Sequence, residues 1–458
     1  MPSVQEQLET LQHVQDAAIH AVQPKVTLPE HLSTLPEAEG DTLVICVGKA
    51  AEEMAIQAEK KLIEQLGPNG FSGIVVTKKG NLANTRVLTA ITAAHPDPDN
   101  TSVAAADAII AAVEKLKANG KRGNRILMFM SGGASALIFK PEQGLSREAA
   151  FAAAKTLVNS GLDIVDMNIV RRVLSQLPGG GLAALAGPEI EMRTYAVSDV
   201  PPSADGRDPL EVIGSGPSVP NPTGYAEARA AIAKAKYPFP DEVVAFLGNE
   251  TAPVIDASHP TFAAGNKDFT RVIANNRMAI NAAATYAREH GFVPIVLPDW
   301  VSGDAAQAAK QFAEVALTLT RTGFYDNVDY RGKRVMLFAG GEPTVKAPEG
   351  FDGDGGRANH MALQFALTMH NELPKDKIGV GNFFATDGGD GRGDQSGATT
   401  DPDTITRGLA QGLDAAQHIT DCRAVYYLRA TRNTKPSFIS GTNVCDAAVY
   451  IPVIPPAP

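Results

Sequence analysis

The amino-acid sequence predicts a folded, two-domain α/β protein, and three observations support this prediction. Short runs rich in branched and aromatic residues alternate with Ala-rich segments whose apolar residues recur at helical spacing. The chain has 458 residues, more than a single hydrophobic core usually supports, so we expect two domains. Hydrophobic residues make up 44% of the chain and charged residues 20%, as in ordinary folded proteins. A disordered or fibrous chain is therefore excluded.

Five strands are expected in the first half of the chain, with helices between them. The strands cover residues 42–48, 73–77, 87–93, 125–131 and 194–200. Apolar residues at helical spacing predict helices at 50–66, 101–119 and 148–159, and Thr101 stands at an N-cap position. The first twenty residues lack the basic start and apolar run of a secretory signal. We expect them to form an amphipathic helix instead.

The second half of the chain begins a fresh α/β run after two irregular segments. Residues 201–224 are rich in Pro and Gly, and we expect them to form an ordered functional loop. Residues 249–268 are also irregular, so the boundary is expected to separate domains 1–245 and 246–458. Beyond it we expect strands at 271–275, 293–299, 334–341 and 381–389, and helices at 276–290, 303–321 and 357–371.

Charge and cysteine content restrict the class of protein. The formal net charge is −10, which argues against a nucleic-acid-binding protein, because such proteins usually carry a basic face. The cysteines, Cys46, Cys422 and Cys445, show no zinc-site spacing and suit a reducing compartment. No run approaches the roughly 20 apolar residues that span a bilayer. We therefore predict a cytoplasmic protein that binds neither nucleic acid nor a membrane.

Two glycine-containing turns follow predicted strands of the first half, where open α/β sheets bind ligands. Gly48 and Lys49 lie between a strand and a helix, so the ammonium group can attract an anion; a solvated lysine is the alternative. Residues 131–135, Ser-Gly-Gly-Ala-Ser, can present N–H groups to a phosphate. Glycine pairs after strands also occur for structural reasons alone. The chain contains no Walker A pattern, GxxxxGK[ST].

A third cluster surrounds the strand tip at Asp199. Its carboxylate is placed to accept a proton from an attacking hydroxyl or to help hold magnesium (Mg²⁺). Upstream, Arg171 and Arg172 precede three consecutive glycines and are candidates for bordering the same anionic site. For the two arginines, a role in packing a core helix and a role in binding phosphate remain equally open.

The fourth cluster lies in the second half of the chain. Glu342 ends a predicted strand, and Arg357 begins a predicted helix, where its planar guanidinium suits a phosphate or carboxylate. Asp387 and Asp390 stand in a glycine-rich turn that lacks the Glu and the flanking helices of an EF-hand, so we interpret it as presenting carboxylates to a magnesium nucleotide. The histidines, including His95 and His360, are better explained by structural roles.

Together the clusters supply cations, carboxylates and glycine-rich turns from two α/β units, which suits phosphoryl transfer. The residues assigned to nucleotide binding are Gly48, Ser131, Gly132, Gly133, Ala134, Ser135, Gly179, Gly180, Gly181, Glu342, Asp387 and Asp390. The candidate magnesium ligands are Asp199 and Asp387.

Several motifs resemble those of class II glycerate kinase, also called glycerate 2-kinase, whose C-terminal part is the MOFRL domain. The motifs are VGKAAEEMA (47–55), HPDPD (95–99), SGGASALI (131–138), NIVRRVLSQLPGGGLA (168–183), SDVPPSADGRDPLEVIGSGPSVPNPT (198–223), GGEPTV (340–345) and ATDGGDGRGDQSGA (385–398). The similarity covers residues 40–450. The chain differs from the family pattern in having Ala358 before Asn359, and a shortened SGTNV stretch near the C-terminus.

The resemblance implies a Rossmann-like N-terminal domain, a smaller α/β C-terminal domain with its MOFRL region at about 330–450, and an active site in the cleft between them. It also implies that ATP phosphorylates the 2-hydroxyl of D-glycerate, giving 2-phosphoglycerate. The matching catalytic residues are Lys49, Asp199 and Arg357. Lys49 and Arg357 would stabilise charge on the phosphoryl group and the substrate carboxylate, and Asp199 would help deprotonate the hydroxyl. The sequence leaves open whether the chain forms a homodimer.

The main rival prediction is an NAD(P)H-dependent hydroxypyruvate reductase, a name that relatives with this pattern have often carried. An NAD site of the usual type needs GxGxxG between a strand and a helix, with an acidic residue about 20 positions later. The sequence has no such fingerprint. We therefore prefer the kinase.

Overall fold

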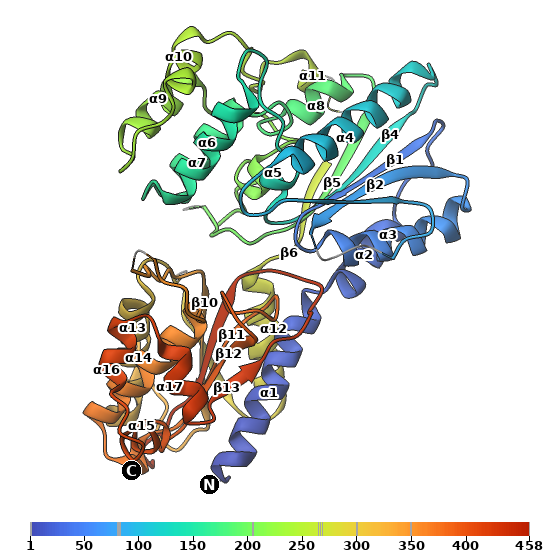
Figure 1. Ribbon diagram of the computed structural model, residues 1–458. Coiled ribbons are helices and arrows are strands. Elements are labelled where there is room, and N and C mark those ends of the chain that lie inside the picture. Colours follow the sequence, from blue (N-terminus) through green and yellow to red (C-terminus); the bar gives the residue numbers. More distant parts are fainter. Residues whose placement is uncertain are drawn as a thin grey trace. The chain divides into compact units, whose positions relative to one another are not determined.

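The computed structural model describes residues 2–79, 84–203, 206–263, 265, 267, 269–298, 301–348 and 350–457. The chain forms two units, which Figure 1 shows with their elements labelled. The Rossmann-like unit is Pro24–Ile273, and the C-terminal unit combines Met1–Gln23 with Ala274–Pro458. The sequence placed the boundary between residues 245 and 246, whereas the structure places it after Ile273 and moves the first 23 residues to the C-terminal unit.

The Rossmann-like unit contains a six-stranded sheet in the order β3-β2-β1-β4-β5-β6, which is the strand order of the Rossmann fold. Its strands are β1 (Thr42–Val47), β2 (Phe71–Lys78), β3 (Thr89–Ala93), β4 (Arg125–Met130), β5 (Glu191–Val197) and β6 (Phe269–Ala274). Strand β1 pairs in parallel with both β2 and β4. Both β1 and β4 are buried along their whole length, as expected for central strands covered on both faces.

Helices cover both faces of this sheet. Its helices are α2 (Pro24–Ser33), α3 (Ala51–Leu66), α4 (Asn100–Ala118), α5 (Ala134–Leu137), α6 (Arg147–Asn159), α7 (Ile164–Leu174), α8 (Gly181–Ala186), α9 (Tyr225–Ala233), α10 (Asp241–Asn249) and α11 (Pro260–Ala263). Leu43, Ile45 and Val47 of β1 pack with α4 on one face. Helix α3 covers the opposite face (Figure 1), to which Val44 and Cys46 point because side chains alternate along a strand.

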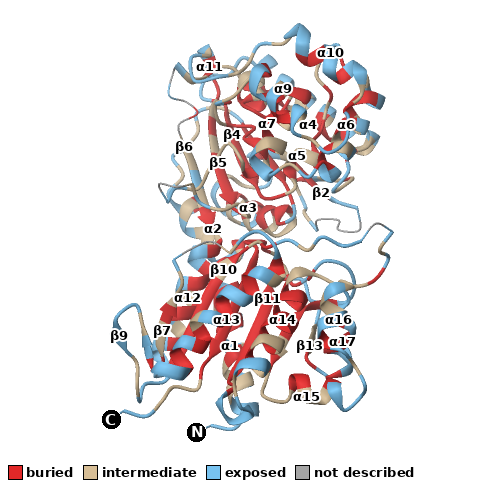
Figure 2. Ribbon diagram, turned by 90° about the vertical axis from the view of Figure 1, so that its left-hand side faces the viewer, coloured by how far each residue is buried: buried red, intermediate tan, exposed pale blue. Residues whose placement is uncertain are grey.

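The C-terminal unit contains a mixed sheet in the order β13-β12-β11-β14-β10-β7. Its strands are β7 (Val293–Val296), β10 (Val335–Gly341), β11 (Val380–Ala385), β12 (Gln395–Thr400), β13 (Thr434–Pro436) and β14 (Asp446–Ile451). Strand β14 runs antiparallel to both β10 and β11, and β10 runs parallel to β7. A separate two-stranded sheet joins β8 (Phe324–Tyr325) to β9 (Val328–Asp329). Figure 2 shows β10 and β11 as buried strands.

Helices also cover both faces of the mixed sheet. They are α1 (Val4–Ala21), α12 (Asn276–Glu289), α13 (Ala305–Thr322), α14 (Arg357–Glu372), α15 (Thr404–Leu409), α16 (Ala415–Thr420) and α17 (Ala424–Ala430). One core joins α13 and α14 to the sheet through Phe312, Phe365 and Phe383. Helices α1 and α12 pack together on the other face. Among the described helices, none combines the length and hydropathy that crossing a bilayer requires.

Helix α1 belongs to the C-terminal unit because its polar and apolar contacts both lie there. Leu11 and Val14 are fully buried. The Asn382 side-chain amide on β11 donates to the Leu11 carbonyl at 3.3 Å and to Gln15 Oε1 at 3.0 Å. Thr442 Oγ1 donates to the Val22 carbonyl at 2.8 Å. Helix α1 therefore packs on a sheet whose strands lie several hundred residues later in the sequence.

Candidate active site

The candidate site of the Rossmann-like unit lies where β1 and β4 end side by side. These strands are neighbours, and the chain continues outward from them in opposite directions along the sheet. Open α/β sheets bind ligands at such a switch point, outside the carboxyl ends of the strands. Gly48 and Lys49 follow β1, and Ser131, Gly132 and Gly133 follow β4. The structure thus brings the first two predicted motifs together.

The two turns are joined by specific hydrogen bonds. The Lys49 N–H donates to the Gly132 carbonyl at 3.0 Å, and the Ala50 N–H donates to the Ser131 hydroxyl at 2.9 Å. Gly48 has a φ of +127°, and a Cβ there would lie 2.3 Å from Ser131 Oγ. Only glycine fits this position without displacing the second turn. The buried Ser131 therefore fixes the turn, whereas the Lys49 side chain is exposed.

Asp199 lies against the same turn. A Cβ on Gly132 would come within 1.6 Å of Asp199 Oδ2, so the carboxylate occupies the space a side chain would take there. A Cβ on Gly133 would lie 2.8 Å from His95 Nε2 and 3.6 Å from Lys49 Cγ. Within the described residues, the N–H groups of Gly132 and Gly133 have no hydrogen-bond partner. The turn therefore combines two N–H donors with an acid, a histidine and a lysine.

Three predicted glycines have a different task in the structure. The N–H groups of Gly179 and Gly180 donate to the carbonyls of Ser215 and Gly216, each at 2.8 Å, and the Gly181 N–H donates to the Pro178 carbonyl at 3.0 Å. These donors are therefore occupied and cannot serve a phosphate. We reassign the three glycines from nucleotide binding to structural roles: Gly179 and Gly180 hold the 201–224 loop in place, and Gly181 closes its own turn.

Arg172 also has a structural role, unlike the neighbouring Arg171. Its guanidinium donates to the Glu211 carbonyl at 3.0 Å and to Thr223 Oγ1 at 2.9 Å. Both partners belong to the 201–224 loop. Arg171 makes no such contacts within the described chain. The sequence left open whether these arginines have a structural or a phosphate-binding role. For Arg172, the structure favours the structural role.

The second group of charged residues lies in the C-terminal unit, at the edge where β10 ends and β14 begins. Arg357, the first residue of α14, donates from one terminal nitrogen to Glu342 Oε1 at 2.7 Å and from Nε to Asp446 Oδ2 at 2.6 Å. The Asp446 side chain is 6% exposed, compared with 33% for Arg357. Burial lowers the pKa of Arg357, and Asp446 and Glu342 more than offset this, so it stays protonated.

Sequence reasoning did not identify Asp446, which carries an unusual proton affinity. Burial raises its pKa to about 7, although Arg357 acts in the opposite direction and Asp390 and Glu342 add to the rise. The only sequence signal is an acidic residue at the start of an apolar strand. Because Asp446 and Glu342 already occupy part of the guanidinium, Arg357 retains only its remaining N–H groups for a ligand.

This proton affinity predicts a pH dependence. A carboxyl that binds its proton more tightly in the folded state loses stabilising free energy as the pH rises from about 4, its unfolded pKa, through about 7. Between about pH 5 and about pH 8, we expect the free energy of unfolding of the C-terminal unit to fall on the order of 2 kcal/mol more in the wild type than in the Asp446→Asn variant. Urea unfolding at both pH values measures this. Equal pH slopes for the two proteins would contradict it.

In the glycine-rich turn of the C-terminal unit, Asp390 has a different role from the one predicted. This residue is 2% exposed, and its carboxylate accepts from the Ala358 N–H at 3.0 Å and from the Asn359 N–H at 2.8 Å. The Asn359 side-chain amide donates to it at 2.6 Å. Asp390 therefore caps the N-terminus of α14, and we reassign it from nucleotide binding. Asp387 is half-buried and accepts from the Gly389 N–H at 3.0 Å.

The two candidate magnesium ligands stand in different units, Asp199 in the Rossmann-like unit and Asp387 in the C-terminal unit. Within the described residues, no group of three or more His, Cys, Asp or Glu side chains is arranged for a metal. Magnesium is commonly bound through one or two carboxylates together with substrate phosphates. Single carboxylates of this kind therefore fit the ion chemically.

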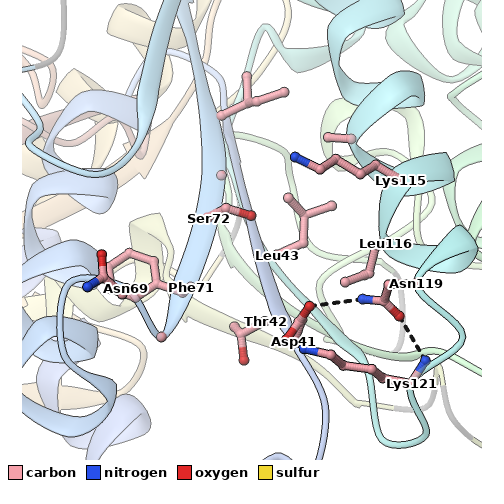
Figure 3. Close-up of a pocket in the computed structure, with 14 residues that line it drawn as sticks. Asp41, Thr42, Leu43, Asn69, Phe71, Ser72, Lys115, Leu116, Asn119 and Lys121 are labelled. Atoms are coloured by element: carbon pink, nitrogen blue, oxygen red, sulfur yellow. Dashed lines mark hydrogen bonds and ion pairs between the residues drawn. The ribbon is translucent and has the colours of Figure 1, made fainter.

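A cavity of about 580 Å³ lies at the opposite, amino edge of the parallel sheet (Figure 3). Its lining includes Asp41, Phe71, Lys115 and Asn119. Asp41 accepts from the Asn119 side chain at 2.9 Å and from Lys121 at 2.7 Å, which ties the end of α4 to the start of β1. None of the predicted site residues lines this cavity.

Comparison with known proteins places these features in context. The family model "Domain of unknown function (DUF4147)" matches residues 10–248, and "MOFRL family" matches residues 335–446. A protein of Agrobacterium vitis named "Putative hydroxypyruvate reductase" is 33% identical over 89% of this chain and 85% of its own length. The D-glycerate 2-kinase of Thermotoga maritima is 28% identical, over 94% of this chain and 95% of its own. The crystal structure of glycerate kinase from Thermotoga maritima matches with a TM-score of 0.80 and 26% identity, over 98% of this chain and 100% of that chain.

Proposed function

Because the chain belongs to the class II glycerate kinase family, whose C-terminal part is the MOFRL domain, we propose that it transfers the γ-phosphoryl group of ATP to the 2-hydroxyl of D-glycerate. The products are 2-phosphoglycerate and ADP. The observation that best supports this proposal is the gathering of Lys49, Asp199 and the Gly132–Gly133 turn at the carboxyl edge of β1 and β4. Phosphoryl transfer needs positioning and charge stabilisation more than covalent chemistry, and these groups supply both.

The residues are proposed to act as follows. Asp199 accepts the proton of the substrate hydroxyl as its oxygen attacks the γ-phosphorus, and the bond to the β-phosphate oxygen breaks, releasing ADP. Lys49 offsets the negative charge that spreads over the transferred group. Arg357 contributes its remaining N–H groups to an anionic part of a substrate. Asp199 and Asp387 are each proposed as a magnesium ligand, and the ion when bound would neutralise nucleotide phosphate charge.

The second candidate, reduction of hydroxypyruvate with NAD(P)H, is favoured by the name of the Agrobacterium vitis relative. The absence of the dinucleotide fingerprint from the sequence argues against it. The two candidates consume different substrates, so they can be separated directly.

The purified chain should convert D-glycerate and MgATP into a phosphoglycerate, which NMR identifies as the 2-isomer. With NADH and hydroxypyruvate, the absorbance of the nicotinamide should stay constant. Oxidation of NADH without phosphoglycerate formation would overturn the proposal in favour of the reductase. Formation of the 3-isomer would support the kinase activity but contradict phosphorylation at the 2-hydroxyl.

A further inference from the structure

Three cations near the candidate site lack the counter-charge that comparable residues have. Lys49, Lys78 and Arg171 have no ion pair or side-chain hydrogen bond within the described part of the chain. By contrast, the neighbouring Lys79 pairs with Asp99 at 2.8 Å, and Arg172 is bonded to the 201–224 loop. Lys49 and Lys78 are exposed and solvated, whereas Arg171 is partly buried, where a cation without a partner is costly.

Strand β2, the turn after β1 and helix α7 bring these cations near His95. Lys78 ends β2 and is in register with Ala93 of β3, two residues before His95. The imidazole of His95 and the stem of Lys49 both border Gly133. Arg171, from α7, lines a small hollow together with Pro96, Pro98 and Ser135. All of these residues belong to the Rossmann-like unit, so their proximity does not depend on the other unit.

The electrostatics agree with this placement. Burial, followed by the charges of Lys49, Lys78 and Arg171, lowers the pKa of His95 to about 4, and no carboxylate counteracts this shift. The imidazole is therefore neutral at physiological pH and can donate or accept a hydrogen bond. Burial also lowers the pKa of Arg171. Arg171 is only partly buried, but a guanidinium partly removed from water without a counter-ion is still costly, and a bound anion would offset that cost.

We propose that Lys49, Lys78 and Arg171, with the neutral imidazole of His95, bind the carboxylate of a small 2-hydroxy acid. The planar fork of arginine suits a carboxylate, which it can bind through two parallel hydrogen bonds. Asp199 is the acid that borders this group, against Gly132. A molecule with a carboxylate next to a hydroxyl satisfies both features, because it presents the former to the cations and the latter to Asp199. This inference rests on the proposed function and names the residues that select its substrate.

Calorimetric titration of the full-length protein with D-glycerate tests the inference without turnover. We expect Arg171→Gln and Lys78→Gln each to weaken D-glycerate binding about tenfold or more, as for loss of a hydrogen bond to a charged group. Arg171→Lys should bind with intermediate affinity. The matched control is Lys115→Gln, an exposed lysine at the opposite edge of the sheet, which should bind like the wild type. Glycerol, which lacks the carboxylate, should not bind.

The outcomes separate this inference from the proposed function. Weaker D-glycerate binding in both Gln variants, with unchanged MgATP binding, supports the site even if no phosphoglycerate is ever formed. Unchanged D-glycerate affinity in both variants overturns it, as does a loss confined to MgATP or no D-glycerate binding by the wild type. If the wild type phosphorylates glycerate and both variants keep its KM for D-glycerate, the proposed kinase activity is supported and the proposed carboxylate site is wrong. Lys78 is exposed, so its variant keeps the fold if Arg171→Gln does not.

Discussion

Replacing Lys49 by Ala is expected to lower kcat for glycerate phosphorylation by about 10²–10³-fold, the usual effect of removing one group that stabilises transition-state charge. The fold should survive, because the Lys49 side chain is exposed and the contact that joins the two turns uses its backbone N–H. A coupled ADP-release assay at saturating D-glycerate measures kcat, and a thermal melt followed by circular dichroism checks the fold.

The matched control for this variant is Lys60→Ala. Lys60 is an exposed lysine on α3, the helix that follows Lys49, and it lies away from the turns at the end of β1. Its loss should leave kcat within about twofold of the wild type, because isolated surface charges contribute little. If Lys49→Ala also kept a near wild-type rate, the role assigned to Lys49 in phosphoryl transfer would have to be withdrawn.

Asp390→Ala is expected to lower the free energy of unfolding of the C-terminal unit by about 3 kcal/mol, because buried donors lose their acceptor. The Asp390 carboxylate accepts two backbone N–H groups at the start of α14 and the side-chain amide of Asn359. Alanine would leave all three without a partner in a site that water does not reach. Urea unfolding of the full chain, followed by circular dichroism, measures the loss.

Asp390→Asn distinguishes capping from ligand binding. The Asn oxygen can still accept, and burial already raises the pKa of Asp390, which shows that its charge is costly there. We therefore expect this variant to lose less stability than the alanine variant and to keep the KM for ATP. A raised KM for ATP with unchanged stability would instead restore Asp390 to the nucleotide site that the sequence suggested.

The sequence alone predicted the α/β class, most strands of the first half and the meeting of two motifs at one edge. Gly48 with Lys49, and Ser131 with Gly132, each follow a buried apolar run, and parallel strands present their carboxyl ends at the same edge. Asp199 follows a third such run. These predictions hold because each depends on a local pattern plus one general rule of sheet geometry. The same patterns identify the glycerate kinase family.

Only the tertiary structure decided which distant residues complete each unit and what each site residue contacts. The pattern of α1 predicts a helix, but its partner is a sheet whose Asn382 lies several hundred residues away. Strand β14 was not predicted, although it lies between β10 and β11 and brings Asp446 to Arg357. Gly179 resembles a phosphate-binding glycine until its N–H is found bonded to Ser215. Such pairings depend on which buried faces and hydrogen-bonding groups remain to be matched across the whole fold, and no local stretch of sequence contains that information.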